Sequence, residues 1–162
     1  KYVLYTDFDQ STPIDEMEKF LEAQETGYDM VIGARGAGNE TVRIDEAFLK
    51  LRAEVFAWIV RRIFLPGIID INCGFKTYTN EVTKKIFSSL VISRPRYIKG
   101  AYMGAIDTEI LYLARLYKYK IKQIPVSWIR RPTHGHMLLE PIRVFIDVIR
   151  IWIVKLRGGY NL

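Results

Sequence analysis

The chain begins with a strand, a helix and a second strand in close succession, and this order restricts its fold more than any other feature. Residues 1–6 are an apolar run of strand type, which we expect to be buried. The segment Thr12-Pro13-Ile14-Asp15 then provides a helix N-cap, a proline at the first helical position and an acid three residues after the cap. We expect the helix to end near Gln24, before Gly27, and a strand to follow over residues 29–33. A β-α-β start of this kind predicts an α/β domain.

The later elements are predicted from apolar spacing and from turn residues. A Gly-rich loop at residues 36–40 precedes a long helix with Leu51, Val55, Trp58, Ile59 and Ile63 on one stripe, which Pro66-Gly67 ends. Short strands are expected at residues 68–71 and 74–79, a helix from Asn80, a helix over residues 108–117 and a last strand over residues 120–128.

The segment 137–157 predicts an unusual C-terminal helix. Its charged residues fall on one narrow helical stripe, at Glu140, Arg143, Asp147, Arg150 and Arg157, and most of the remaining circumference is apolar. The longest uncharged stretch is much shorter than the ~20 residues that span a bilayer. The helix therefore either lies in the plane of a membrane interface or packs against other apolar helices.

Composition and charge exclude several classes of protein. With 162 residues, 49% of them hydrophobic, the chain can build one sizeable core and is not a disordered protein. The single cysteine, Cys73, cannot form an internal disulfide. Residues 1–50 carry a net charge of −6 and residues 51–162 a net charge of +12. An acidic first part suits a metal ion, and a basic second part suits anionic lipid, a phosphorylated ligand or nucleic acid. Nucleic acid is disfavoured because the aromatic residues do not alternate with the basic ones.

Two carboxylates, Asp7 and Asp9, follow the first strand at the end where open α/β sheets bind ligands. On an extended strand, residues i and i+2 point to the same side, so this pair can converge on Mg²⁺ or Mn²⁺. The alternative is an acidic pair that caps the next helix or is solvated in a turn. A third interpretation is an aspartate nucleophile of the haloacid-dehalogenase type, since residues 7–11 nearly match its Asp-x-Asp-x-Thr pattern. No second acidic cluster of the required form follows, because Asp107 and Glu109 open a helix.

Four further segments accompany the acidic pair in a specific order. They are Val31-Ile-Gly-Ala-Arg35, Asp70-Ile-Asn-Cys-Gly-Phe-Lys76, Asp107-Thr-Glu-Ile-Leu-Tyr112 and Ile124-Pro-Val-Ser-Trp128. Together with Thr6-Asp7-Phe8-Asp9 they resemble family 2 inverting glycosyltransferases that make dolichyl- or polyprenyl-phosphate sugars, and most of all the dolichyl-phosphate β-glucosyltransferases. The resemblance covers about residues 1–128.

The resemblance implies a partial GT-A fold, the α/β fold of nucleotide-sugar transferases, and a role for each motif. Asp7 and Asp9 would hold Mg²⁺ or Mn²⁺ against the donor diphosphate. Arg35 would bind the acceptor phosphate, with Arg52 as a second candidate, because a guanidinium matches phosphate oxygens. Asp107 or Glu109 would be the catalytic acidic group. A phosphate acceptor has a second pKa of about 6 and needs little help from a base, so positioning is the better role for Asp107.

Other residues of these motifs have structural as well as functional interpretations. Asp70 and Lys76 are expected to bind substrate or to form an ion pair with each other. Cys73 is expected to be a packed residue, not a nucleophile. The pair His134 and His136 lacks a third ligand for a zinc site.

The expected function is transfer of glucose from UDP-glucose to a polyprenyl or dolichyl phosphate at the cytoplasmic face of a membrane. Residues 1–128 would be the C-terminal portion of the transferase domain, and residues 129–162 a basic loop and an amphipathic, membrane-interface helix. The alternatives are use of GDP-mannose and, from another class, a basic membrane-binding module without catalysis. The opening strand and loop of the resembled family do not occur in this sequence. If the 162 residues act alone, we expect an incomplete donor pocket, an exposed apolar sheet edge, and poor solubility or inactivity.

Overall fold

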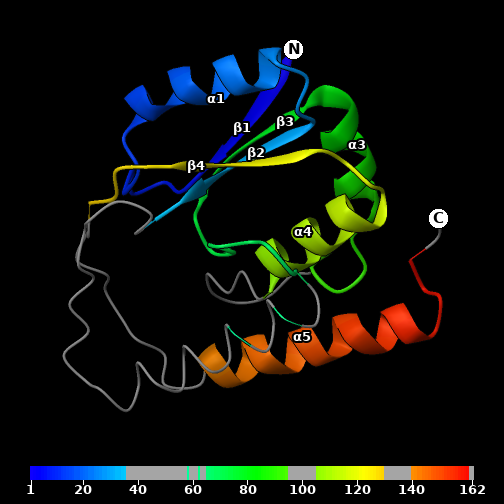
Figure 1. Ribbon diagram of the computed structural model, residues 1–162. Coiled ribbons are helices and arrows are strands. Elements are labelled where there is room, and N and C mark those ends of the chain that lie inside the picture. The colour runs from blue at the N-terminus through cyan, green and yellow to red at the C-terminus, as the bar shows by residue number, and fades with distance from the viewer. Residues whose placement is uncertain (36–57, 59–61, 63–64, 95–104, 130–139, 161–162) are drawn as a thin grey trace.

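The computed structural model describes residues 1–35, 58, 62, 65–94, 105–129 and 140–160 (Figure 1). Within these residues the elements follow one another as β1 (Tyr2–Thr6), a 3₁₀ turn η1 (Ile14–Glu16), α1 (Met17–Glu25), β2 (Met30–Ala34), β3 (Phe75–Thr79), α3 (Asn80–Ser89), α4 (Ile106–Leu116), β4 (Ile121–Pro125) and α5 (Glu140–Leu156). The predicted α/β class is confirmed.

The four strands form one mixed sheet in the order β1-β3-β2-β4. Strand β3 runs antiparallel to both of its neighbours, pairing Lys76 with Tyr5 on β1 and with Ile32 on β2. Strands β2 and β4 are parallel, with Met30 opposite Ile121. The carboxyl ends of β1, β2 and β4 and the start of β3 therefore meet at one edge of the sheet, on the left in Figure 1.

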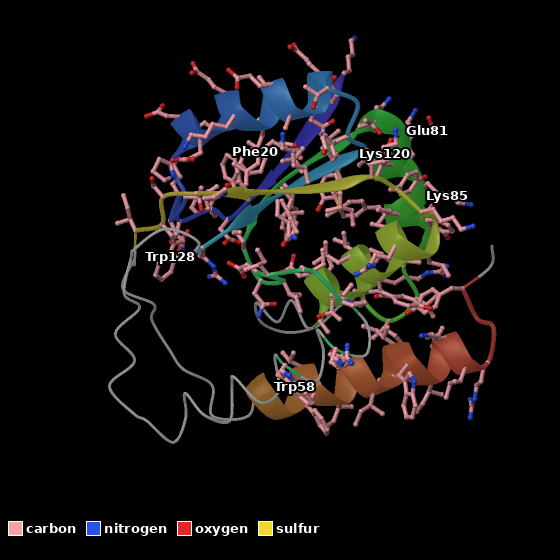
Figure 2. The ribbon with its side chains drawn as sticks, in the orientation of Figure 1. Phe20, Trp58, Glu81, Lys85, Lys120 and Trp128 are labelled. Carbon is pink, nitrogen blue, oxygen red and sulfur yellow. The ribbon has the colours of Figure 1, made fainter. Side chains whose placement is uncertain are left out.

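Side chains alternate between the two faces of the sheet, and each face is covered by helices. Phe20 of α1 packs with Val31 and Phe75 on one face, and Figure 2 shows Phe20 between α1 and the sheet. The larger cluster, on the other face, joins Ile32 and Tyr78 to α3, α4 and α5. In Figure 1, α5 lies below α4, farthest from the sheet.

The first strand differs from its prediction. Residues 1–6 were expected to be buried, but β1 is an edge strand in which Tyr2 is 38% and Val3 37% exposed. An apolar run does not distinguish an edge strand from a central one, because both need apolar residues on the face that packs.

The predicted N-cap of the first helix is also wrong. Thr12 does not cap it. Pro13, in an extended conformation, precedes η1, and no side chain caps either η1 or α1. The end of the helix is as predicted: Gly27 follows it with φ +91°, a conformation that glycine adopts without strain.

Residues 68–71 do not form the predicted strand. The Ile69 amide donates to the side chain of Gln123 at 2.7 Å, and Gln123 in turn donates to the Gly67 carbonyl, so these backbone groups bond to a side chain in place of a neighbouring strand. The other predicted elements after residue 65 are present as β3, α3, α4 and β4, with β4 shorter than expected. The loop at 36–40 and most of the helix expected before Pro66 lie outside the described residues.

Among the described residues, helix α5 packs against its neighbours on one side only. Val148 and Ile151 are buried in the larger cluster, whereas Phe145 and Trp152 are each 45% exposed. Apolar side chains thus occupy both the packed side and the open side of the helix. None of the helices that the structure describes is long and apolar enough to cross a membrane.

Candidate active site

Most of the residues predicted to be functional lie together where the carboxyl ends of β1, β2 and β4 meet the start of β3. Asp7 follows β1, Arg35 follows β2 and Trp128 comes three residues after β4. Trp128 is labelled at this edge in Figure 2. Open α/β sheets bind ligands at the carboxyl ends of their strands, and these three residues lie at that end of the sheet.

Gly74 makes the space that the Asp7 carboxyl occupies. The amide of Asp7 donates to the Gly74 carbonyl at 3.1 Å, which extends the pairing of β1 and β3 by one residue. A Cβ atom added to Gly74 would overlap the Asp7 carboxyl group. Any residue with a side chain at position 74 would therefore displace Asp7.

The Asp7 carboxyl lies in surroundings that disfavour its negative charge. Partial desolvation raises its pKa, and the charges of Asp107 and Asp9 raise it further, against weaker lowering effects of Lys76 and Arg35. Among the described residues, none donates a hydrogen bond to this carboxyl. A divalent cation beside Asp7 would relieve the repulsion between these acids.

Asp9 lies in a turn and not on an extended strand. Strand β1 ends at Thr6, and the Gln10 amide donates to the Asp7 carbonyl, closing a turn. The Asp9 carboxylate accepts hydrogen bonds from the Ser11 amide at 2.9 Å and the Ser11 hydroxyl at 2.8 Å. The two acids are near each other, but the predicted strand geometry is wrong, because this hydrogen-bonded turn replaces it.

Lys76 is a fully buried cation at the centre of the site. Its Nζ donates to Asp107 Oδ1 at 2.6 Å and to the Cys73 carbonyl at 2.6 Å. The ring of Tyr5 lies 5.8 Å from the same nitrogen. Burial and the nearby charges of Asp107 and Asp7 raise the pKa of Tyr5 to about 12.

Arg35 and Asp70 form a two-pronged ion pair. The guanidinium donates Nε to Asp70 Oδ2 at 2.7 Å and Nη2 to Oδ1 at 3.0 Å, while the Arg35 amide also donates to Oδ2. Burial opposes ionisation of Asp70, but the hydrogen bonds and charge of Arg35 outweigh it and lower its pKa. The guanidinium carbon lies 5.6 Å from the ring centre of Trp128. Asp70 accepts from two of the five N–H groups of the guanidinium, and within the described residues no other acceptor is bonded to the remaining three.

The loop after β4 is fastened to the segment that carries the acidic pair. The Ile129 amide donates to the Ser11 carbonyl at 2.7 Å. The Glu16 carboxylate, which is almost fully buried, accepts from the Ser127 amide and from Lys19. The residues on both sides of Trp128 are therefore hydrogen-bonded to the segment 11–16, which limits the movement of Trp128.

Glu109 has contacts different from those of Asp107, although both lie in the first turn of α4. Its buried carboxylate accepts from the amides of Val91, Ile92 and Ser93 at 2.7–3.0 Å and from the Tyr160 hydroxyl at 2.9 Å. These four donors tie α4 to the loop after α3 and to the segment after α5. Of the two predicted catalytic acids, the structure brings only Asp107 into contact with Lys76.

The predicted pair of Asp70 with Lys76 does not form, because each has another partner. Cys73 is packed in the core, as expected, and burial raises the pKa of its thiol. Arg52, His134 and His136 lie outside the described residues. Sequence reasoning assigned no role to Tyr5. Tyr5 pairs with Lys76 across β1 and β3, so its side chain lies on the same face of the sheet as that of Lys76. The pairing of these two strands is the signal that could have indicated Tyr5.

The carboxylates present fit a metal ion that shares its coordination with a ligand. Among the described residues, no group of three or more His, Cys, Asp or Glu side chains forms a complete metal site. Mg²⁺ is commonly held by one or two carboxylates together with substrate phosphates and water. Asp7 and Asp9 are a donor set of this kind.

Comparison with known proteins gives a consistent set of relatives. The chain is 29% identical to a dolichyl-phosphate β-glucosyltransferase of Homo sapiens in an alignment of 133 positions, which covers 78% of this chain and 38% of the human protein. It is 28% identical to the dolichyl-phosphate β-glucosyltransferase ALG5A of Trichomonas vaginalis in an alignment of 166 positions, which covers 99% of the chain and 48% of that protein. A dolichyl-phosphate β-glucosyltransferase of Drosophila melanogaster is 25% identical over 99% of the chain and 49% of its own length. No family model matches the chain. The chain thus spans less than half the length of these three relatives.

Proposed function

Since the chain belongs to a dolichyl-phosphate glucosyltransferase-like family, we propose that it carries the strand-end site of an enzyme that transfers glucose from UDP-glucose to dolichyl phosphate. The fold that we propose for the whole protein is GT-A. The observation that carries the proposal is that Asp9, Arg35 and Asp107 lie near Asp7 at the ends of the strands, where Asp107 pairs with the buried Lys76.

Asp7 and Asp9 are the residues that would hold Mg²⁺ or Mn²⁺ beside the donor diphosphate. The raised pKa of Asp7 supports this role, because clustered acids bind a cation more strongly than an isolated one. A bound metal ion would supply Lewis-acid stabilisation of the departing nucleoside diphosphate. Gly74 keeps the Asp7 carboxyl in place for that contact.

Arg35 is the residue that would bind the acceptor phosphate. Asp70 fixes the plane of its guanidinium, and Trp128 covers one side of it, so the remaining N–H groups have a defined direction. Fixed guanidinium groups suit phosphate because two parallel N–H groups match two oxygens.

Asp107 has a positioning role in this proposal. Lys76 holds its carboxylate, and a phosphate oxygen of the acceptor attacks the anomeric carbon without transferring a proton to the protein. The new bond forms between that oxygen and the anomeric carbon. The bond from this carbon to the β-phosphate oxygen breaks, and UDP leaves with the electron pair, so the configuration at the anomeric carbon is inverted.

The test is a transfer assay on the protein with labelled UDP-glucose, dolichyl phosphate and Mg²⁺ or Mn²⁺. We expect a chloroform-soluble glucolipid, and at least a 100-fold loss in Asp9→Ala, on the scale at which loss of electrostatic groups of a site lowers kcat. The matched control is Asp15→Ala, an exposed acid on η1, which should retain wild-type activity. Equal product from wild type and Asp9→Ala would contradict the metal assignment. Product from GDP-mannose in place of UDP-glucose would change the donor.

A membrane-binding module without catalysis is the second candidate, and the exposed apolar side of α5 favours it. It requires no donor and no metal. If the protein bound vesicles but neither donor nor acceptor in any assay, this second function would replace the first.

A further inference from the structure

The side chain of Gln123, on β4, is bonded to the loop that carries Asp70. Its amide nitrogen donates to the Gly67 carbonyl at 2.7 Å, and its amide oxygen accepts from the Ile69 amide at 2.7 Å. A glutamine can do both at once because its amide has a donor and an acceptor. The side chain thus bonds to the loop as a neighbouring strand would, through the carbonyl of one residue and the amide of the residue two places later.

The bond to Ile69 limits movement of the backbone next to Asp70. The Ile69 side chain is 54% exposed, whereas Ile68 and Ile71 are each 7% exposed and packed in the larger cluster. Residue 69 therefore lies where the loop leaves the core. The amide of this residue is the group that Gln123 holds.

Asp70 transmits the position of the loop to the Arg35 guanidinium. Its Oδ2 accepts from Nε at 2.7 Å and from the Arg35 backbone amide at 3.0 Å, and its Oδ1 accepts from Nη2 at 3.0 Å. Two parallel bonds of this kind fix the plane of a guanidinium as well as its distance. A shift of the loop would therefore move or tilt Arg35.

We propose that Gln123 is a positioning residue for the acceptor phosphate, and that it acts through Asp70 on Arg35. Gln123 holds the loop at residues 67–69, Asp70 holds the guanidinium, and the remaining N–H groups of Arg35 bind the phosphate. The inference rests on the proposed role of Arg35 and adds a residue that touches no substrate. A binding group that is held in this way needs no reordering when its ligand arrives, which strengthens binding.

The fold should tolerate the loss of the Gln123 amide. Gln123 is half-buried, and its bonds to Gly67 and Ile69 lie near solvent, so water can replace each of them. Separate water molecules do not hold the two backbone groups at a fixed distance from β4. In Gln123→Met, whose side chain has a similar length and no amide, the loop should therefore shift while the sheet stays intact.

Calorimetry with citronellyl phosphate, a short isoprenoid phosphate, measures acceptor binding without the transfer reaction. We expect Gln123→Met to bind this probe about fivefold more weakly than wild type, because a misplaced guanidinium no longer matches two phosphate oxygens. The matched control is Lys122→Met. Lys122 is the adjacent half-buried residue of β4, its side chain lies on the opposite face, and its Nζ is 5.2 Å from the ring centre of Tyr28. The control should bind within twofold of wild type, and circular dichroism should show that both variants are folded.

A double variant separates positioning from a general structural effect. Arg35→Met should weaken binding of citronellyl phosphate at least tenfold, since it removes the guanidinium itself. Arg35→Met/Gln123→Met should then bind within twofold of Arg35→Met. This lack of additivity is expected if Gln123 acts through Arg35, and a general loss of structure would not produce it.

The possible results distinguish the role of Gln123 from the role of Arg35. Equal binding by wild type and Gln123→Met, with binding weakened in Arg35→Met, would overturn the role of Gln123 alone. Additive losses in the double variant would do the same. If wild type did not bind citronellyl phosphate, or bound it no better than Arg35→Met does, the acceptor role of Arg35 would be wrong and the inference about Gln123 with it.

Discussion

At the scale of single residues, two small features organise the candidate site: the absence of a side chain at Gly74 and the burial of the Lys76 ammonium. Gly74 lets the Asp7 carboxyl lie against the backbone of the neighbouring strand. Lys76 has no exposed surface and joins the Cys73 carbonyl to Asp107. Gly74 determines where the Asp7 carboxyl lies, and Lys76 determines where the Asp107 carboxylate lies. Each of these effects can be tested by one substitution.

Gly74→Ala should lower activity without unfolding the protein. The added methyl group would overlap the Asp7 carboxyl, which must rotate away from the site. Overpacking of this kind costs about 1–3 kcal/mol of the free energy of unfolding. We expect at least a tenfold fall in glucosyl transfer, with a two-state urea transition retained. Wild-type activity in the variant would show that the position of Asp7 is unimportant.

Lys76→Met should destabilise the fold strongly. It removes the cation from Asp107, whose side chain is 22% exposed, and the donor from a buried carbonyl. Removing one partner of a buried ion pair costs about 3–5 kcal/mol, and the partial exposure of Asp107 puts the expected loss at about 3 kcal/mol.

Urea denaturation measures this loss, and Lys19→Met is the control. Lys19 pairs with Glu16 in the same way but is 56% exposed, so its loss should cost less than about 1 kcal/mol. In Lys76→Met/Asp107→Asn the second substitution should recover part of the stability. Equal losses in the Lys76 and Lys19 variants would contradict the central place of Lys76.

At the scale of elements, Glu109 holds three parts of the molecule together. Its carboxylate joins α4 to residues 91–93 and to Tyr160. Burial and the adjacent Glu109 carboxylate raise the pKa of Tyr160, so this hydroxyl stays protonated and donates. The carboxylate is therefore a junction between helices, which accounts for its burial without a catalytic role.

Glu109→Gln should lower stability and not transfer chemistry. An amide has one oxygen where the carboxylate has two, so some of the four groups that donate to Glu109 would lose their acceptor. We expect this to lower the free energy of unfolding by about 2–3 kcal/mol. Tyr160→Phe should cost about 1 kcal/mol, and the exposed control Glu18→Gln less than about 0.5 kcal/mol. Urea denaturation and transfer assays on folded protein separate the two roles. A fully folded Glu109→Gln protein with activity reduced 100-fold would restore the catalytic interpretation.

The elements also show what sequence alone can predict. Periodicity identified β2, β3, α3, α4 and β4, because their apolar spacing and their turn residues are local signals. It missed the edge position of β1 and the 3₁₀ turn before α1, since strand order and helix caps depend on contacts between distant segments. In the same way, the motif spacing indicated Arg35, Asp70, Lys76 and Asp107, but not which acid pairs with which base. The ion pairs span 31 and 35 residues, and only the folded chain sets them.

At the scale of the whole molecule, the uneven charge along the chain has a spatial counterpart. The acidic pair lies at the ends of the strands, whereas α5, which carries the exposed Arg150, lies on the side of α4 away from the sheet (Figure 1). The formal net charge of +6 averages over these two regions. We propose that a donor with its metal ion binds in the first region.

Binding of UDP-glucose by calorimetry, with and without Mn²⁺, tests the metal-and-donor site most directly. We predict at least tenfold tighter binding when Mn²⁺ is present, and loss of this gain in Asp7→Asn. The control Asp15→Asn, an exposed acid outside the site, should retain it. Donor binding that is equal with and without Mn²⁺, or equal in wild type and Asp7→Asn, would contradict the assignment of Asp7 and Asp9 to a metal that holds the donor diphosphate.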